Sequence, residues 1–293
     1  SMRSFDYIES GKTLLTPHTT SLLAAIHEAK GRQSIQTTIR PDILGTLVAV
    51  ARIQSTDASN RIEGISTSDS RLNDLVSEKV TPRNRNEEEI AGYRDAISVI
   101  HESHDYIPIT PNVILQLHRD LFRHTPLTFA GHFKDSDNVI IERDAHGTST
   151  VRFAPPSALV TPELIERACS AYTQAIRDGH TDPLLAIAMF ILDFTCIHPF
   201  NDGNGRMSRL LTLLMLYRNG YMVGKYISIE HLIEQSKRTY YEAMTASTQG
   251  WDDNANDYAP FTNYLLGIIL SACKEFDEAS ISRQAAERRE HRE

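Results

Sequence analysis

The segment from Leu184 to Ile197 constrains the fold of this chain more than any other. Its sequence, LLAIAMFILDFTCI, is apolar at nearly every position, so a helix built from it has no polar face to turn toward water. It is also shorter than the roughly 20 apolar residues that span a bilayer. We therefore expect a helix at the centre of the molecule, with other helices packed around it.

Helical periodicity dominates the rest of the chain. Apolar residues at spacings of three and four, several times with a glycine near the end of the run, predict helices. These cover residues 17–32, 42–64, 85–103, 110–125, 161–179, 207–220, 228–248 and 256–276. The charged residues 282–293 predict a solvated helical tail. The expected fold class is mainly α.

One region departs from the helical pattern. Residues 131–154 contain two short β-type runs, Asn138–Ile141 and Thr148–Phe153, joined by the turn-rich residues 144–147. Two prolines, Pro155 and Pro156, follow. This pattern predicts a β-hairpin, and because two strands alone are marginally stable, the hairpin should lean on the helical body.

The composition excludes several classes of protein. A net charge of −8 and a pI near 5.8 argue against a general nucleic-acid surface, which needs clustered lysine and arginine. No apolar run is long enough for a membrane span, and the start of the chain has no signal-peptide pattern. The three cysteines fit neither a metal site nor a disulfide framework. We expect a cytoplasmic protein that uses neither membrane nor nucleic acid.

A polar stretch follows the central apolar segment at once. Residues 198–209 read HPFNDGNGRMSR. Asn204 should begin a new helix whose first backbone amides lack partners, and the glycines at 203 and 205 would let a ligand approach closely. Amides at the positive end of a helix suit phosphate. The stretch therefore predicts an anion site.

The side chains of the same stretch add charge and a base. Arg206 and Arg209 are three residues apart, which places both on one face of the helix. Asp202 offers a hard oxygen ligand for Mg²⁺, and His198 can act as a base near neutral pH. Each feature alone has an ordinary structural explanation, and His198 with Asp202 could instead be metal ligands, although Pro199 breaks the helix that would align them. Together, they favour a nucleotide site.

The run HPFNDGNGR, with the further arginine at position 209, resembles the signature of the Fic domain without a mismatch. The resemblance extends from about residue 45 to residue 270 and includes the hairpin with its double proline. It implies a helical Fic-type bundle with one β-hairpin flap. Members of this family are usually protein adenylyltransferases, which move AMP from ATP to a hydroxyl of a target protein.

The resemblance also implies roles for residues of the polar stretch. His198 would take the proton from a Ser, Thr or Tyr hydroxyl of the target, and Phe200 would anchor the loop in the core. Asp202 would hold Mg²⁺. The phosphates of ATP would bind to Gly203, Asn204, Gly205, Arg206 and Arg209.

Further residues implied by the resemblance lie outside this stretch. The flap would pair with the backbone of the target, and Val139, Ile140 or Ile141 would lie near the nucleotide. Tyr240, Tyr241 and Met244 are candidates for the adenine pocket, although core packing explains each of them about as well.

A second motif, SNRIEG, covers residues 59–64. By itself it is common capping chemistry, but a carboxylate at the C-terminal end of a helix is unfavourable and suggests a partner elsewhere. In Fic proteins the pattern formed here by Ser59, Glu63 and Gly64 marks an inhibitory helix. Its glutamate pairs with the second arginine of the main motif, Arg209 in this chain, and prevents productive binding of ATP.

The sequence thus predicts an autoinhibited protein adenylyltransferase that modifies a target protein or itself. One alternative is an enzyme that removes AMP or transfers another phosphate-containing group. A second is a regulatory or interaction protein with a DNA-associated C-terminal module. Expected partners are ATP, Mg²⁺ and an unidentified target on the flap, while the formation of a homo-oligomer is left open.

We divide the chain into three parts on the same basis. Residues 1–105 form an N-terminal helical region that carries the inhibitory motif. Residues 106–270 form the catalytic core. Residues 271–293 form the charged helical tail, at the place where a further C-terminal module would start.

Overall fold

Helix α8, Pro183–Ile197, is the central helix that the apolar segment predicts. Proline occupies its first turn, and the Asp182 side chain caps it by accepting a hydrogen bond from the Leu184 amide at 2.9 Å. Helices α7 (Thr161–Asp178) and α9 (Asn204–Arg218) pack directly against it. Nearly every side chain of α8 and α9 is buried, so these two helices form the middle of the hydrophobic core.

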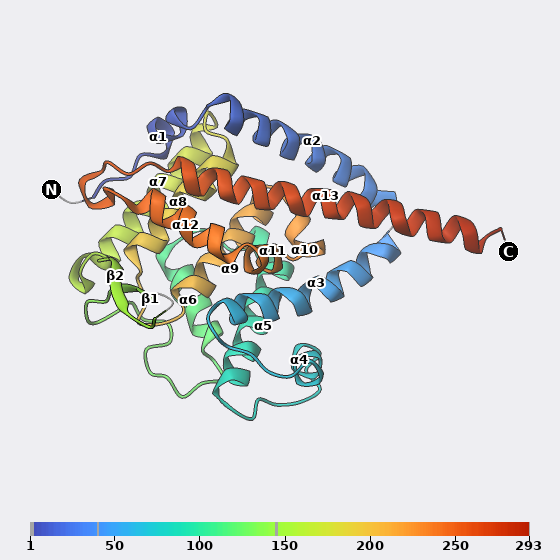
Figure 1. Ribbon diagram of the computed structural model, residues 1–293, viewed down its shortest axis with the longest axis horizontal. Coiled ribbons are helices and arrows are strands. Elements are labelled where there is room, and N and C mark those ends of the chain that lie inside the picture. Colours follow the sequence, from blue (N-terminus) through green and yellow to red (C-terminus); the bar gives the residue numbers. More distant parts are fainter. Residues whose placement is uncertain (1–2, 40, 144–145, 293) are drawn as a thin grey trace.

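The remaining helices surround this pair (Figure 1). The computed structural model describes residues 3–39, 41–143 and 146–292, and within them the chain is mainly helical, as predicted. In chain order the other α-helices are α1 (Tyr7–Thr13), α2 (Pro17–Ile39), α3 (Pro41–Ile62), α4 (Asp69–Val76), α5 (Arg85–Ser103), α6 (Pro111–Leu121), α10 (Val223–Tyr226), α11 (Ile229–Gln235), α12 (Lys237–Thr248) and α13 (Ala259–Glu290).

The predicted hairpin is present at one side of the bundle. Strands β1 (Ile140–Arg143) and β2 (Ser149–Phe153) pair antiparallel, with an irregularity in register between Ile140 and Ile141. Of the predicted turn, residues 144 and 145 lie outside the described residues. Phe153, at the end of β2, packs edge-on against Trp251, so the hairpin does lean on the helical body.

Three helices differ from the sequence-based expectation. Helix α2 continues past Gly31 to Ile39, so that glycine does not end it. The run predicted as one helix over 228–248 is interrupted at Ser236, whose hydroxyl bonds the Leu232 carbonyl at 2.8 Å and the Tyr264 hydroxyl at 2.6 Å. Such side-chain bonds compete with the helical ladder. Helix α13 runs without a break through residue 271, packed along α2, and its last turns protrude from the body.

The N-terminal segment is fastened to the core by a buried carboxylate. Asp193, in the middle of α8, accepts hydrogen bonds from Tyr7 (2.6 Å), Trp251 (2.8 Å) and Tyr258 (2.9 Å). The guanidinium of Arg3 lies 3.6 Å from it. Asp193 is the only charged residue of the apolar segment, and these four groups offset the cost of burying its carboxylate.

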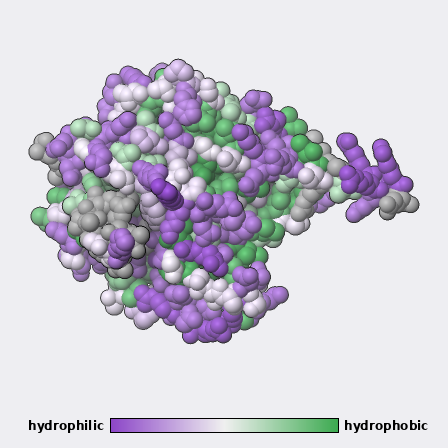
Figure 2. All heavy atoms as spheres, in the orientation of Figure 1, coloured by the Kyte–Doolittle hydropathy of each residue, from purple (hydrophilic) through white to green (hydrophobic). Residues whose placement is uncertain are grey.

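The visible surface is mixed, and the protruding end of α13 is hydrophilic (Figure 2). Across the described ranges, no helix combines the length and apolar character that a membrane crossing requires. The polar end of α13 agrees with the solvated tail that the sequence predicts.

Candidate active site

The polar stretch forms a tight loop between α8 and α9. His198 ends α8 in the left-handed region, with φ of 49°, and donates its backbone N–H to the Phe194 carbonyl at 3.0 Å. The Asn204 side chain closes the loop by bonding both the amide (2.9 Å) and the carbonyl (2.8 Å) of Phe200. Gly203, with φ of 85°, precedes the first residue of α9. Asn204 therefore shapes the loop through its side chain, a role that the sequence did not predict.

A cavity of about 430 Å³ opens at this loop. Its volume lies in the range of small-molecule sites. It is lined by residues from five parts of the chain: Glu63, Ile140, Ile141, Thr195, His198, Asn204, Gly205, Ser208, Arg209, Tyr240, Tyr241 and Met244. Glu63 of the SNRIEG motif, the hairpin, the polar stretch and the tyrosines of α12 thus meet around one space.

Most of the predicted site residues line this cavity, but Ser59, Gly64, Asp202, Gly203 and Arg206 do not. Val139 does not line it and is largely exposed on the hairpin. Thr195 and Ser208 line it without having been predicted. Tyr240 and Met244 are buried as well as lining the cavity, so packing and ligand contact are compatible for both.

Glu63 lies over the N-terminal end of α9. Its Oε1 is 2.8 Å from Nη2 of Arg209, whose guanidinium also donates to the Ser59 hydroxyl (2.8 Å) and the Ser59 carbonyl (2.9 Å). A Cβ at Gly205 would be 2.2 Å from the same Oε1, so only glycine allows this approach. The carboxylate therefore occupies a place suited to an anion.

The ionisation of Glu63 follows from this position. Its side chain is 33% exposed, and partial burial acts to raise its pKa. The Arg209 guanidinium outweighs that effect, so the pKa of the Glu63 carboxyl is held below its ordinary value. The pair is therefore charged at neutral pH.

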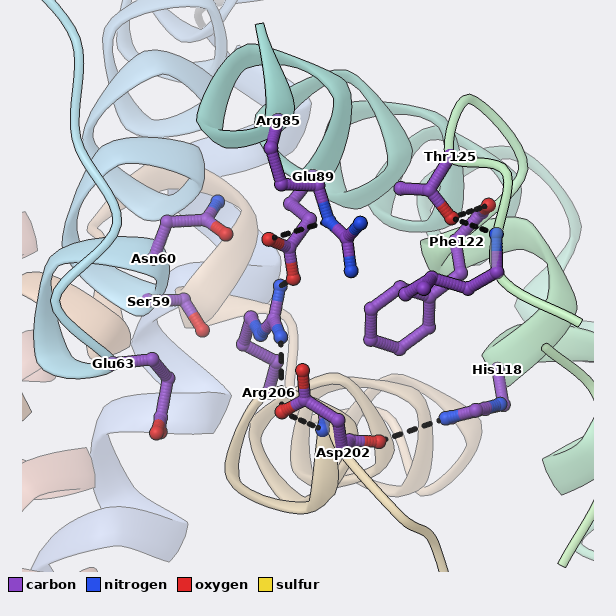
Figure 3. A network of polar contacts seen from close by, with 12 residues as sticks. Ser59, Asn60, Glu63, Arg85, Glu89, His118, Phe122, Thr125, Asp202 and Arg206 are labelled. Carbon is purple, nitrogen blue, oxygen red and sulfur yellow. Dashed lines mark hydrogen bonds and ion pairs between the residues drawn. The ribbon is translucent and has the colours of Figure 1, made fainter. Parts of the chain in front are cut away.

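Arg206 does not line the cavity, and its side chain points toward Glu89 (Figure 3). Its guanidinium is 1% exposed, lies 3.0 Å from Glu89 and 3.7 Å from Asp202, and stacks over the Phe122 ring at 5.2 Å. Arg85 lies on the other side of the same Glu89 carboxylate, at 3.3 Å. The two motif arginines are thus held by two different glutamates. Glu89 gave no signal in the sequence beyond its place in the acidic first turns of α5.

Asp202 is held in place by a histidine that the sequence did not single out. His118 Nδ1 accepts the Gly131 amide at 2.9 Å, so its Nε2 carries the proton and donates to the Asp202 carbonyl at 2.9 Å (Figure 3). Burial lowers the pKa of His118 to about 4, which keeps the ring neutral. The ring also stacks on Phe200 at 3.8 Å, and Phe200 is fully buried.

The donor set fits a cation that arrives with phosphate. The Asp202 side chain is 56% exposed, and one of its oxygens accepts the Gly203 amide at 2.7 Å. Over the residues described, no group of three or more His, Cys, Asp or Glu side chains is placed to hold a metal. Mg²⁺ normally binds through one or two carboxylates together with phosphate oxygens and water, so one exposed aspartate is sufficient for it.

A mainly helical body with a β-hairpin beside a glycine-bounded helix N-terminus defines the fold class, and known proteins share it. The Fic/DOC family model matches residues 108–216. This part of the chain is therefore similar to the Fic domain, in agreement with the resemblance of the signature.

The relatives with established names support the same assignment. The chain is 37% identical over 90 residues to a Fido domain-containing protein of Dictyostelium discoideum, covering 29% of this chain and 58% of the relative. It is 26% identical over 189 residues to protein adenylyltransferase fic-1 of Caenorhabditis elegans, covering 64% and 30%. This chain thus spans less than two thirds of the length of either relative.

Solved structures share the fold across most of the chain. A Fic family protein from Desulfovibrio desulfuricans has a TM-score of 0.73 at 23% identity, covering 90% of this chain and 75% of that one. A Fic domain containing signaling protein from Bacteroides thetaiotaomicron has a TM-score of 0.74 at 22% identity, covering 88% and 97%. The mainly α fold is therefore the Fic fold.

Proposed function

We propose that this chain is a protein adenylyltransferase that Glu63 holds in an inhibited state. One observation carries the proposal: Glu63 pairs with Arg209 over the first amides of α9, in the cavity that His198 also lines. The names of the curated relatives support the activity. The intact motif supports it for this chain, together with the cavity that His198, Arg209, Glu63, the hairpin and the tyrosines of α12 share.

The proposed reaction moves AMP from ATP to a protein hydroxyl. His198 takes the proton of a Ser, Thr or Tyr hydroxyl, and the oxygen forms a bond to the α-phosphorus as the bond to pyrophosphate breaks. Amides at the start of α9 and the guanidinium of Arg209 stabilise the charge on the phosphates. Mg²⁺, when held by Asp202, supplies further neutralisation of that charge.

Further groups of the cavity would hold the two substrates. Tyr240, Tyr241 and Met244 offer an aromatic and apolar surface to the adenine base. Ile140 and Ile141 place the hairpin at the same cavity, where the backbone of an extended target segment can add to a strand edge.

Inhibition follows because the Glu63 carboxylate and a phosphate of ATP compete for Arg209. A carboxylate at 2.8 Å from Arg209 removes a charge intended for phosphate and adds a negative charge beside it. Productive ATP binding then requires the pair to open. Ser59, which bonds Arg209 through its hydroxyl and carbonyl, would keep the guanidinium in place after Glu63 has left.

The experiment compares the natural chain with the Glu63→Gly variant. Each is incubated with α-labelled ATP, Mg²⁺ and a cell lysate, and labelled proteins are identified by mass spectrometry. A coupling of about 1–3 kcal/mol predicts a rise in labelling of roughly 5- to 150-fold for Glu63→Gly. The matched control is Glu242→Gly, since Glu242 lies on exposed α12 surface and pairs only with Arg238 among the described residues. Equal labelling by all three proteins would contradict inhibition.

Removal of AMP is a second candidate, because a carboxylate in the same cavity as His198 could orient a water molecule. Incubating the natural chain with a target that already carries labelled AMP separates the two activities. If the natural chain releases AMP and the Glu63→Gly variant does not, removal of AMP is the favoured activity.

A further inference from the structure

Two residues at the base of the hairpin bind the loop that carries His198. Lys134 precedes the hairpin and is 3% exposed. Its Nζ donates to the Asn138 side-chain oxygen (2.8 Å), the Pro156 carbonyl (2.9 Å) and the Ile197 carbonyl (3.2 Å). The ammonium thus joins the entry of the hairpin, its exit and the end of α8.

Together these two residues satisfy four consecutive carbonyls. The Nζ of Lys134 donates to the carbonyl of Ile197. The backbone N–H of Lys134 donates to the carbonyl of Pro199 at 2.8 Å. The side-chain amide of Asn138 donates to the carbonyls of His198 and Phe200, each at 3.2 Å. The whole turn from 197 to 200 is therefore held from the hairpin side.

This turn needs such support because His198 has φ of 49°. The left-handed region is unfavourable for a residue with a Cβ and persists only where neighbouring groups enforce it. The backbone conformation at His198 sets the direction in which its imidazole leaves the chain.

The three partners of Lys134 explain why an ammonium group lies at this place with no carboxylate of the described residues bonded to it. All three acceptors are neutral oxygens, two carbonyls and one amide, and an ammonium group has three donors to give them. Burial lowers the pKa of Lys134 to about 8, although Asp137 acts in the opposite direction. Burying an amine is costly unless its donors are hydrogen-bonded, and these three bonds offset that cost.

We propose that Lys134 is a positioning residue: with Asn138 it fixes the left-handed turn at His198 and ties both ends of the hairpin to it. The same contacts thus orient both the imidazole of His198 and the flap. The proposal rests on the proposed function for the role of His198 as base. It does not involve the phosphate-binding groups of α9, which Lys134 does not contact in the described structure.

The test uses Glu63→Gly as the parent, in which labelling should be measurable. Lys134→Met is added to it, with Lys79→Met as the matched control because Lys79 is exposed after α4. We expect Lys134→Met to lower the kcat of labelling by about 10- to 100-fold, as a misplaced base does, while the Kd for ATP by calorimetry changes less than about threefold. Lys79→Met should match the parent in both.

A second readout is independent of catalysis. In spectra of the ¹⁵N-histidine-labelled protein, the imidazole signal of His198, assigned by its absence in His198→Ala, should shift in Lys134→Met and not in Lys79→Met. If the parent labels nothing, the adenylyltransferase proposal fails, and this signal alone decides the role of Lys134. Should Lys134→Met not fold, Asn138→Ala is used instead. It removes the donor to two of the four carbonyls and one acceptor of Lys134, and should show the same split between kcat and Kd.

Two results would overturn the proposal. One is a Lys134→Met variant that labels within twofold of the parent and leaves the His198 signal unchanged. The other is a loss of labelling matched by an equal loss of ATP affinity, which would show that Lys134 merely supports the fold.

Discussion

The close approach of Glu63 to Gly205 can be tested without any assumption about activity. An alanine at 205 would place its Cβ 2.2 Å from Glu63 Oε1 and 3.3 Å from Arg209 Nη1. A contact of 2.2 Å is not tolerated, so the carboxylate must withdraw and lengthen its 2.8 Å bond to Arg209. The 3.3 Å contact with Arg209, which Ser59 holds in place, requires only a small shift. Gly205→Ala should therefore break the pair.

The expected energies follow from two opposing effects. Gly205 has a helical backbone, and glycine to alanine at a compatible helical position stabilises by about 0.4–1 kcal/mol. Loss of a partly exposed ion pair costs about 1 kcal/mol. In the natural chain the two effects nearly cancel. In a Glu63→Ala background only the gain remains, so Gly205→Ala should stabilise that protein.

A double-mutant cycle measures this difference. The free energy of unfolding of the natural chain, both single variants and the double variant is determined by urea denaturation followed by circular dichroism. We expect an interaction energy of about 1 kcal/mol, which exceeds the scatter of about 0.3–0.5 kcal/mol for independent sites. If the two substitutions are additive within that scatter, Glu63 does not rest over Gly205 in solution.

Three further predictions concern the loop and its surroundings. His198→Ala should abolish labelling while calorimetry shows nearly unchanged ATP binding, since the phosphates are held by other groups; normal labelling would remove His198 from its role as base. Asp202→Ala should lose the Mg²⁺-dependent labelling, because no other carboxylate of the motif can replace it; titrating the metal checks this, and an unchanged metal dependence would place the cation elsewhere. The hydrogen bond from Arg71 outweighs the effect of burial and lowers the pKa of Glu87 to about 2, compared with 4.5 unperturbed. The ionised carboxylate therefore stabilises the fold above pH 4.5, and this stabilisation is lost as the pH falls through 2. Urea denaturation at stepped pH should show a smaller decline for Glu87→Gln than for the natural chain, and parallel declines would contradict this.

The sequence predicted the parts of this molecule that depend on local pattern. The all-apolar segment indicated α8, and the alternation after residue 137 indicated the hairpin, with each strand starting within two residues of the prediction. It could not show that the helix is interrupted at Ser236, because one of the two bonds of that hydroxyl goes to Tyr264, which lies in α13 and is far away in the sequence.

The same division applies to the site. The signature motif named His198 and Arg209, and the second motif named Glu63, because their chemistry lies in short runs of sequence. The residues that hold these groups were missed. Glu89 and Lys134 come from separate segments, and only the folded chain brings their side chains to Arg206 and to the Ile197 carbonyl. A charged residue inside a helix or loop has many ordinary explanations until its neighbours are known.

The Asp193 network also determines when this protein can finish folding. Arg3 and Tyr7 come from one end of the chain, whereas Trp251 and Tyr258 follow Asp193 by 58 and 65 residues. During synthesis the carboxylate of α8 must therefore wait for partners that the ribosome has not yet made. Contacts of such large sequence separation form late and slow the search for the native state. In a nascent chain α7 and α9 can cover parts of α8 early, but the face of α8 that carries Asp193 lacks Trp251 and Tyr258 until residue 258 has emerged.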